Sequence, residues 1–301
     1  MRSGLRLHYF TQGHVFRLSP RLQFTLLPRA PLSLRVGFSK NYQVLHQLFL
    51  ENTNSASMWV ITTGSQGPSA VENYTAGLYL KPVPSFAFQV EGYYREYDNL
   101  RRHEINAPPQ ITSTNVQRFV PWFSSNSAYA QGLEFMYNQT IGPATWTNSY
   151  TLSKTEFLNE EIQEERYPPE WDRRHQFTSN LQIRITPAIS TNLTWYYASG
   201  NANVLAYRES EHEVINNEPE EERLPDYHRL DASIKATINM RNKSQLDLRF
   251  SVYNIYDQAN VWYREPIQVF RSDRPASGLR FYNVDVFDLA FQPAFDVSLS
   301  F

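Results

Sequence analysis

Two stretches of the chain are rich in acidic residues, the groups in this sequence with the clearest capacity for metal chemistry. Glutamates crowd residues 160–172 and again 209–222. Carboxylate oxygens are the ligands that Ca²⁺ prefers, so loop-bound calcium is one expectation. Glu211, His212 and Glu213 also place an imidazole between two carboxylates, an arrangement that could hold a transition metal. We favour the plainer alternative that both stretches are solvated loops, because runs of like charge usually stay in water.

No catalytic pattern accompanies these carboxylates. His103 begins the letters HEINA, but the second histidine of a zinc-protease helix is missing. The sequence has neither a Gly-x-Ser-x-Gly elbow nor a phosphate-binding glycine loop. Its lack of cysteine excludes disulfides, thiolate metal sites and a cysteine nucleophile. We therefore expect no enzymatic activity and no cofactor, and a formal net charge of -2 gives no reason to expect nucleic acid as a partner.

A further group of polar residues lies where a long loop is expected to enter a strand. At the rim of a sheet, such side chains could either contact a ligand or pair with one another across neighbouring strands. We favour the pairing role for the acidic and basic groups of 171–175, whereas the basic residues of another loop could attract anionic ligands. The rim candidates are Trp171, Asp172, Arg173, Arg174 and His175 in the first loop, with Arg101 and Arg102 in the second.

The elements that would position these residues are β-strands, because apolar and polar residues alternate with a period of two. In RLDASIKATINM, residues 229–240, every second residue from Leu230 to Met240 is apolar and the residues between them are polar. Aromatic residues make up 15% of the chain although its mean hydropathy is -0.52, and no apolar run reaches the roughly 18 residues of a membrane helix. This composition fits a soluble all-β protein or a membrane β-barrel, in which only alternate residues face lipid.

The lengths of the expected strands and connections favour the membrane barrel. Several strands reach about ten residues, the length of a tilted membrane strand. Tight turns built from Pro, Gly or Asn alternate with long loops, as in an up-and-down barrel with turns at one end and loops at the other. Greek-key sandwiches do not predict this alternation. About a dozen strands are expected, near 4–10, 19–27, 31–40, 73–81, 85–98, 126–138, 143–156, 174–186, 188–199, 228–240, 244–258 and 291–301.

Four stretches resemble the C-terminal half of a TonB-dependent outer-membrane receptor of the Bacteroidota type. They occur in the family's order and extend over nearly the whole chain. The resemblance implies a 22-stranded barrel, of which this chain would hold the last twelve strands, so that residues 1–301 form the C-terminal portion of one barrel. The stretches are SPRLQF…LSLRVGFSKNYQ, YAQGLEF, RYPPEWDRRHQF and RLPDYHRLDASIK…DLRFSVYNIYDQANVWY.

The resemblance also implies a location and a set of partners. The family's members reside in the bacterial outer membrane and import a scarce nutrient such as an iron chelate, cobalamin or a glycan. The expected partners are outer-membrane lipid, the barrel-assembly machinery, an N-terminal plug with the remaining strands, TonB–ExbB–ExbD acting through that plug, and a surface lipoprotein. Because no signal peptide, plug or TonB-contacting segment is recognisable in the sequence, we expect a fragment of a longer receptor. The alternatives are a non-transporting barrel or adhesin and, less favoured, a soluble β-rich carbohydrate-active protein.

The last strand carries an expected assembly signal. The chain ends AFDVSLSF, in which polar residues separate the apolar ones up to the final position. A terminal Phe after alternating apolar residues resembles the signal that the barrel-assembly machinery reads. The residues of this signal are Phe295, Val297, Leu299 and Phe301.

Overall fold

The computed structural model is built from β-strands joined by turns and loops. In the part of the chain that it describes, no helix has the length and apolar character needed to cross a membrane. The described residues are 1–11, 14–49, 57–61, 67–103, 123–158, 166–202, 205–208, 213–216, 223–240, 244–270 and 279–301.

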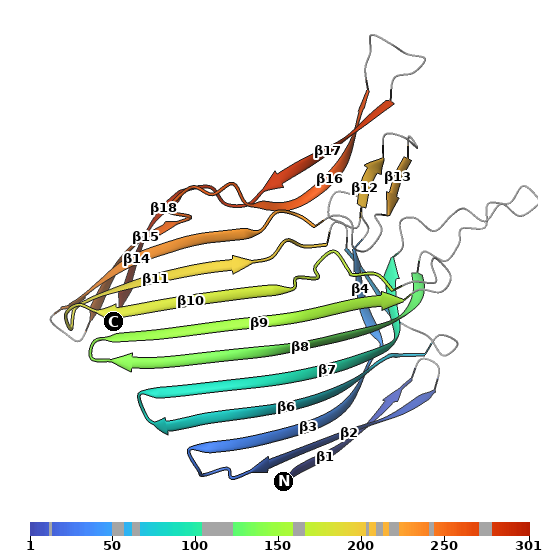
Figure 1. Cartoon of the computed structure of the whole chain (residues 1–301), viewed down its shortest axis with the longest axis horizontal. Coiled ribbons are helices and arrows are strands. Elements are labelled where there is room, and N and C mark those ends of the chain that lie inside the picture. Colours follow the sequence, from blue (N-terminus) through green and yellow to red (C-terminus); the bar gives the residue numbers. More distant parts are fainter. Residues whose placement is uncertain are drawn as a thin grey trace, which may run out of the picture.

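Twelve strands form one curved antiparallel sheet, as predicted (Figure 1). Each pairs with the next of the twelve along the chain, and β1 and β18 are the two edges of the sheet. The strands are β1 (Arg2–Phe10), β2 (Val15–Leu26), β3 (Leu32–Gln43), β6 (Ser69–Val83), β7 (Phe86–His103), β8 (Phe123–Ile141), β9 (Ala144–Leu158), β10 (His175–Arg184), β11 (Ile189–Ala198), β14 (Tyr227–Asn239), β15 (Gln245–Tyr253) and β18 (Gln292–Ser300).

The connections divide into a turn end and a loop end, on the left and right of Figure 1. β8 and β9 are joined at the turn end by two residues, and Gly142 there has a φ of 56°, a left-handed conformation that glycine adopts without strain. One connection departs from the predicted alternation of short and long. β1 and β2 are joined at the loop end by residues 11–14 alone.

Three small hairpins, which the sequence pattern does not predict, lie beyond the sheet at the loop end (Figure 1). They belong to connections that the sequence predicts to be loops throughout. Their strands are short or lack a clean alternation, and β16 contains Pro266, which argues against a strand in sequence-based reasoning. The hairpins pair β4 (Leu45–Phe49) with β5 (Ser57–Ile61), β12 (Leu205–Arg208) with β13 (Glu213–Asn216), and β16 (Val261–Phe270) with β17 (Leu279–Phe287).

The strand register carries the alternation across the whole sheet and gives it one apolar and one polar face. Ile234 lies opposite Phe250, which in turn lies opposite Phe295. On the other face, Lys235 and Arg249 are opposite one another. The apolar side chains are solvent-exposed in this chain, with Ile234 46% exposed. Such a surface is stable only against lipid or another apolar partner.

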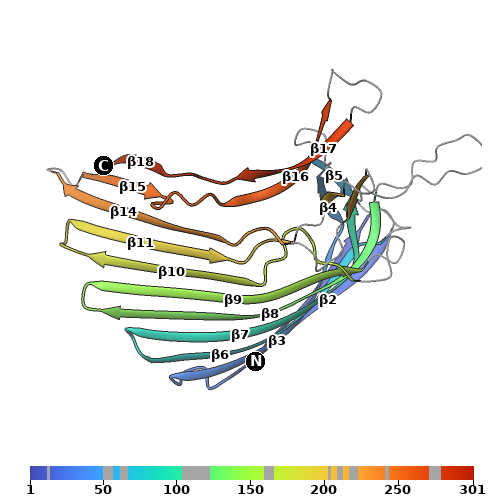
Figure 2. The ribbon, with the colours of Figure 1, turned by 45° about the horizontal axis from the view of Figure 1, so that its top comes forward.

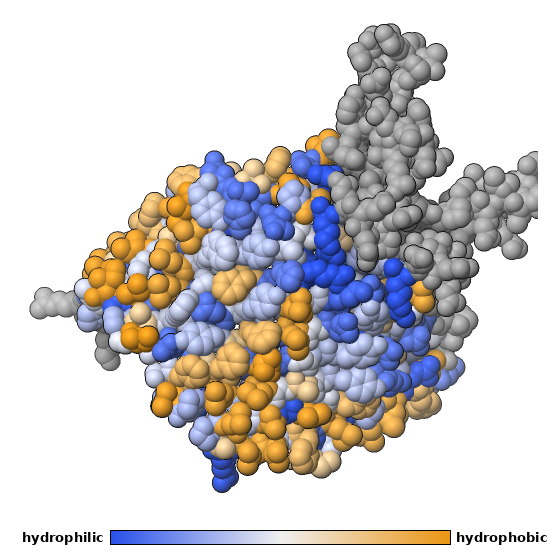
Figure 3. All heavy atoms as spheres, in the orientation of Figure 1, coloured by the Kyte–Doolittle hydropathy of each residue, from blue (hydrophilic) through white to orange (hydrophobic). Residues whose placement is uncertain are grey.

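The polar face is the concave one. Figure 2 shows the strands following one another around an arc, so the sheet forms a trough. Small polar residues of the inner face are crowded by their neighbours, as in Ser251, which is 4% exposed. Large apolar residues of the other face splay apart and are exposed. In Figure 3 the most hydrophilic residues gather beside the loop end, where the sheet would leave the membrane.

Candidate functional site

Asp172 is the centre of a cluster at the loop end, just before β10. Its side chain is 2% exposed. One carboxylate oxygen accepts a hydrogen bond from the backbone N–H of Thr155 at 2.8 Å, and the other accepts one from Nη2 of Arg223 at 2.8 Å. Nε of Arg174 lies 3.7 Å from the same oxygen as Arg223. A buried carboxylate is stable only with such partners, so this arrangement fixes the approach to β10.

Arg223 joins the roots of two long connections. It lies before β14, whereas Asp172 lies before β10. Nη2 of Arg223 binds the carboxylate, and Nη1 donates to the backbone carbonyl oxygens of Asp172 at 3.1 Å and Gly200 at 3.2 Å. The loop between β9 and β10 is therefore tied to the loop between β11 and β14. Of the rim candidates, Asp172 and Arg174 have contacts that fit a structural role.

The flanking aromatic candidates have different surroundings. The ring of Trp171 packs edge-on against Phe157 with a centroid distance of 5.7 Å and remains largely exposed. His175 lies opposite Leu152 and therefore on the apolar face. Its Nδ1 lies 2.8 Å from the hydroxyl of Tyr150, at the loop end of that face.

Arg173 differs from its neighbours because no carboxylate contacts it among the described residues. Its Nε donates to the side-chain oxygen of Asn201. The guanidinium carbon lies 5.8 Å from the centroid of the Tyr227 ring, which shares the polar face with Arg229. Partial burial lowers the pKa of Arg173 from its ordinary value, because removing water disfavours the charged form.

A second buried cluster forms where β15 ends. Asn254 is fully buried and has a φ of 50°. Its backbone N–H donates to the carboxylate of Asp231 at 2.9 Å, and its side-chain amide donates to the carbonyls of Gln258 and Leu289, both at 2.9 Å. Asn260, 1% exposed, bonds both backbone groups of His228 at 3.0 Å. Asn254 and Asn260 are not among the predicted site residues. Both lie in the fourth family-like stretch, where the Tyr-Asn-x-Tyr-Asp spacing of residues 253–257 was the available signal.

We predict that Asn254→Ala lowers the free energy of unfolding by about 1–3 kcal/mol, since the buried carbonyl of Leu289 and the N–H of Gln258 lose their partner. Asn254→Gly removes the same hydrogen bonds but tolerates the positive φ. It should therefore be less destabilising than alanine. Urea unfolding of the complete receptor refolded into lipid vesicles measures both losses, and equal losses would show that the backbone conformation contributes nothing.

The concave wall carries arginines stacked on tyrosines. The guanidinium carbon of Arg35 lies 4.2 Å from the ring centroid of Tyr79, and that of Arg95 lies 4.5 Å from Tyr93. Gly132, from the stretch YAQGLEF, is needed here because an added Cβ would lie 2.7 Å from the Tyr93 hydroxyl and 2.8 Å from a backbone oxygen. The glycine thus lets the Tyr93 ring lie flat against the wall.

Two carboxylates face each other on this wall. Glu91 lies directly opposite Glu134 on the adjacent strand. The hydroxyl of Tyr79 donates to Glu91 at 2.5 Å, but no cation pairs with either glutamate among the described residues. Like charges at directly opposite positions destabilise a sheet, so a cationic partner in the trough would relieve this repulsion.

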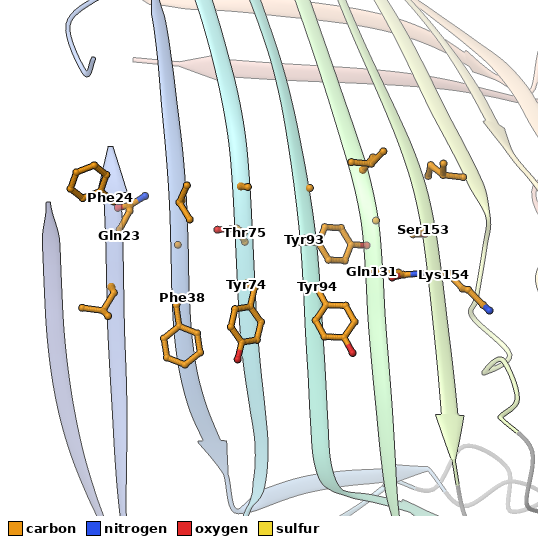
Figure 4. A pocket seen from close by; sticks show the side chains of 18 of the residues that line it. Gln23, Phe24, Phe38, Tyr74, Thr75, Tyr93, Tyr94, Gln131, Ser153 and Lys154 are labelled. Carbon is orange, nitrogen blue, oxygen red and sulfur yellow. The ribbon is translucent and has the colours of Figure 1, made fainter. Parts of the chain in front are cut away.

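A groove of about 1030 Å³ crosses the opposite, apolar face from β2 to β9. Figure 4 shows Phe38, Tyr74 and Tyr94 side by side along it, with Lys154 toward one end. On the side of the groove that faces the loop end of the sheet, the ammonium of Lys154 lies 2.6 Å from the carboxylate of Glu156. An apolar groove bordered by charges on its loop side matches the boundary between lipid tails and head groups.

Several of the predicted site residues lie wholly or partly outside the described part of the chain. Arg101 and Arg102 lie near the end of β7, but their side chains are outside the described part of the structure. The same holds for the side chain of Glu213 and for the whole of Glu211 and His212. Among the residues that are described, no group of three or more His, Asp or Glu could hold a metal ion. Calcium in the acidic loops stays a prediction.

Residues 3–255 match the family model of the TonB dependent receptor-like β-barrel. The chain belongs to this family. It is accordingly a β-barrel segment of a bacterial outer-membrane receptor, and the family consists of receptors for transport. No curated protein sequence matches the chain.

Solved structures of TonB-dependent receptors share the fold. A mutant of the ferric enterobactin receptor of Pseudomonas aeruginosa is 14% identical, with a TM-score of 0.59 over 99% of this chain and 41% of that one. The ferric yersiniabactin uptake receptor of Yersinia pestis is 12% identical, with a TM-score of 0.60 over 94% of this chain and 37% of that one. The TonB-dependent receptor segment described here thus spans about two fifths of these receptors' length.

Proposed function

We propose that this chain is the C-terminal part of a 22-stranded receptor barrel that imports a scarce nutrient with energy from TonB–ExbB–ExbD. The observation that carries the proposal is the open twelve-stranded trough, with a polar concave wall and unpaired edges at β1 and β18. An open edge in a membrane is costly because its backbone groups have no partners there. The remaining strands of the receptor would satisfy these edges.

The polar wall supports a plug as the occupant of the trough. Glu91 and Glu134 would meet basic side chains of an N-terminal plug domain, which would relieve their mutual repulsion. An iron chelate is the favoured nutrient, because two of the similar structures are a ferric enterobactin receptor and a ferric yersiniabactin uptake receptor. Cobalamin and glycans are the other candidates.

The test is nutrient uptake in cells. The complete receptor gene would be expressed in matched strains with and without TonB, and both strains would lack their own iron receptors. Growth on a ferric chelate only in the TonB-containing strain is the expected result. A heat-modifiable outer-membrane protein that supports no uptake would instead indicate the alternative, a non-transporting barrel or adhesin.

Assembly provides a further prediction. Phe295, Val297, Leu299 and Phe301 are all exposed along one edge of the sheet, and we propose that the barrel-assembly machinery reads them. Deleting Phe301 should slow the appearance of the heat-modifiable form at least several-fold in a pulse-chase experiment. Phe287→Ala, which truncates an exposed aromatic residue outside the twelve-stranded sheet, is the control. Equal assembly rates for the deletion and the intact chain would remove Phe301 from the signal.

A further inference from the structure

Four arginines gather at the loop-end rim, and three of them are paired with carboxylates. Nη2 of Arg223 lies 2.8 Å from Asp172, and Nε of Arg174 lies 3.7 Å from the same carboxylate. Nε of Arg229 lies 3.2 Å from the carboxylate of Asp231, two residues along the same strand. Arg173 is the exception, because no carboxylate of the described residues lies within ion-pair distance of it.

The guanidinium of Arg173 has more donors than its contacts use. An arginine side chain carries five N–H donors in a planar fork. Asn201 accepts from Nε, and the Tyr227 ring covers the guanidinium without accepting an in-plane hydrogen bond. Within the described residues, the four N–H groups of the two terminal nitrogens have no protein acceptor. Arg173 is half-buried, so these donors are also partly removed from water, which is unfavourable unless another acceptor is supplied.

The groups that hold Arg173 are themselves fixed. The hydroxyl of Tyr227 donates to the carboxylate of Asp288 at 2.9 Å and accepts from Nη1 of Arg229 at 3.1 Å. The backbone of Asn201 accepts a hydrogen bond from the N–H of Leu224 at 2.9 Å. Little side-chain entropy therefore remains to be lost when a ligand binds, which is the condition for a preorganised site.

We propose that Arg173 binds an oxyanion of the imported ligand, a carboxylate or phosphate group, at the loop end of the concave wall. The two terminal nitrogens present the parallel donors that a planar carboxylate or a phosphate accepts in bidentate fashion. This inference rests on the proposed receptor function and narrows its ligand to acidic compounds. Arg173 was among the rim candidates, but its partners Asn201 and Tyr227 were not.

Binding to the complete receptor, purified in detergent micelles, tests the proposal, with heat-modifiable migration as the check on folding. Citrate and inorganic phosphate are the probes, titrated separately by calorimetry to distinguish a carboxylate ligand from a phosphate ligand. Arg173→Gln should weaken binding of the recognised probe by roughly tenfold or more, since hydrogen bonds to a charged group are lost. Arg173→Lys retains the charge but not the fork, so it should restore only part of the affinity.

Arg184→Gln is the matched control. Arg184 ends the same strand that Arg173 precedes, is exposed and lies on the polar face at the turn end. Binding should be unchanged in this variant. Equal weakening by both substitutions would show that only the loss of a positive charge matters, which would overturn the proposal. A folded wild-type protein that binds neither probe would also overturn it. Because these measurements need neither TonB nor uptake, they fail independently of the proposed transport function.

Discussion

Replacing Asp172 with alanine is expected to lower the free energy of unfolding by about 3 kcal/mol, the lower end of what breaking a buried ion pair costs. The loss is large because the substitution leaves Arg223 without its carboxylate and the N–H of Thr155 without its acceptor. The lower end applies because the side chain of Arg223 is 30% exposed and can regain water. Urea unfolding of the complete receptor in lipid vesicles, followed by tryptophan fluorescence, measures the change.

The control for Asp172 is Asp296→Ala. Asp296 is exposed on β18 and has no ion-pair partner among the described residues, so its loss should change stability by no more than about 0.5 kcal/mol. A double-mutant cycle with Arg223→Gln then isolates the pair, with an expected coupling of about 1–3 kcal/mol. Losses of equal size at Asp172 and Asp296 would contradict the structural role of this cluster.

The twelve strands of the sheet could be predicted because the alternation of apolar and polar residues is contained within each strand's own sequence. In β14, the period of two assigns a face to every residue from Leu230 to Ile238, and the neighbouring strands follow the same rule across the register. Once one face must be apolar, a shift by one residue would reverse every side chain. Alternation together with tight turns therefore determined both the sheet and its topology.

The ends of the strands and the contacts at the rim were harder to predict from the sequence. We predicted a strand over 244–258, but β15 ends at Tyr253 because Asn254 and Asp257 adopt positive φ values of 50° and 52°. The partner of Asp172 is Arg223, 51 residues further along the chain. No periodicity joins such distant positions. Their contact depends on two long connections returning to neighbouring points of the rim, which only the folded sheet specifies.

Ile234→Lys should prevent or strongly impair insertion of the barrel, whereas Lys235→Leu should be tolerated. Ile234 is in the middle of β14 on the apolar face, between Thr191 and Phe250. A lysine there must lose its hydration against lipid, which costs about 2–4 kcal/mol at the membrane midplane. Lys235 faces the trough and pairs with Asp247 at 2.9 Å. Losing that half-exposed pair costs no more than about 1 kcal/mol.

Heat-modifiable migration of outer-membrane fractions separates the two variants. Ile234→Lys should leave most of the protein in the non-modifiable form, while Lys235→Leu should migrate like the wild type. The two positions are adjacent in one strand and share its backbone hydrogen bonds, so they differ in little besides the face that each side chain occupies. Normal migration of Ile234→Lys would therefore contradict the assignment of the apolar face to lipid, even if the pairing of the strands is correct.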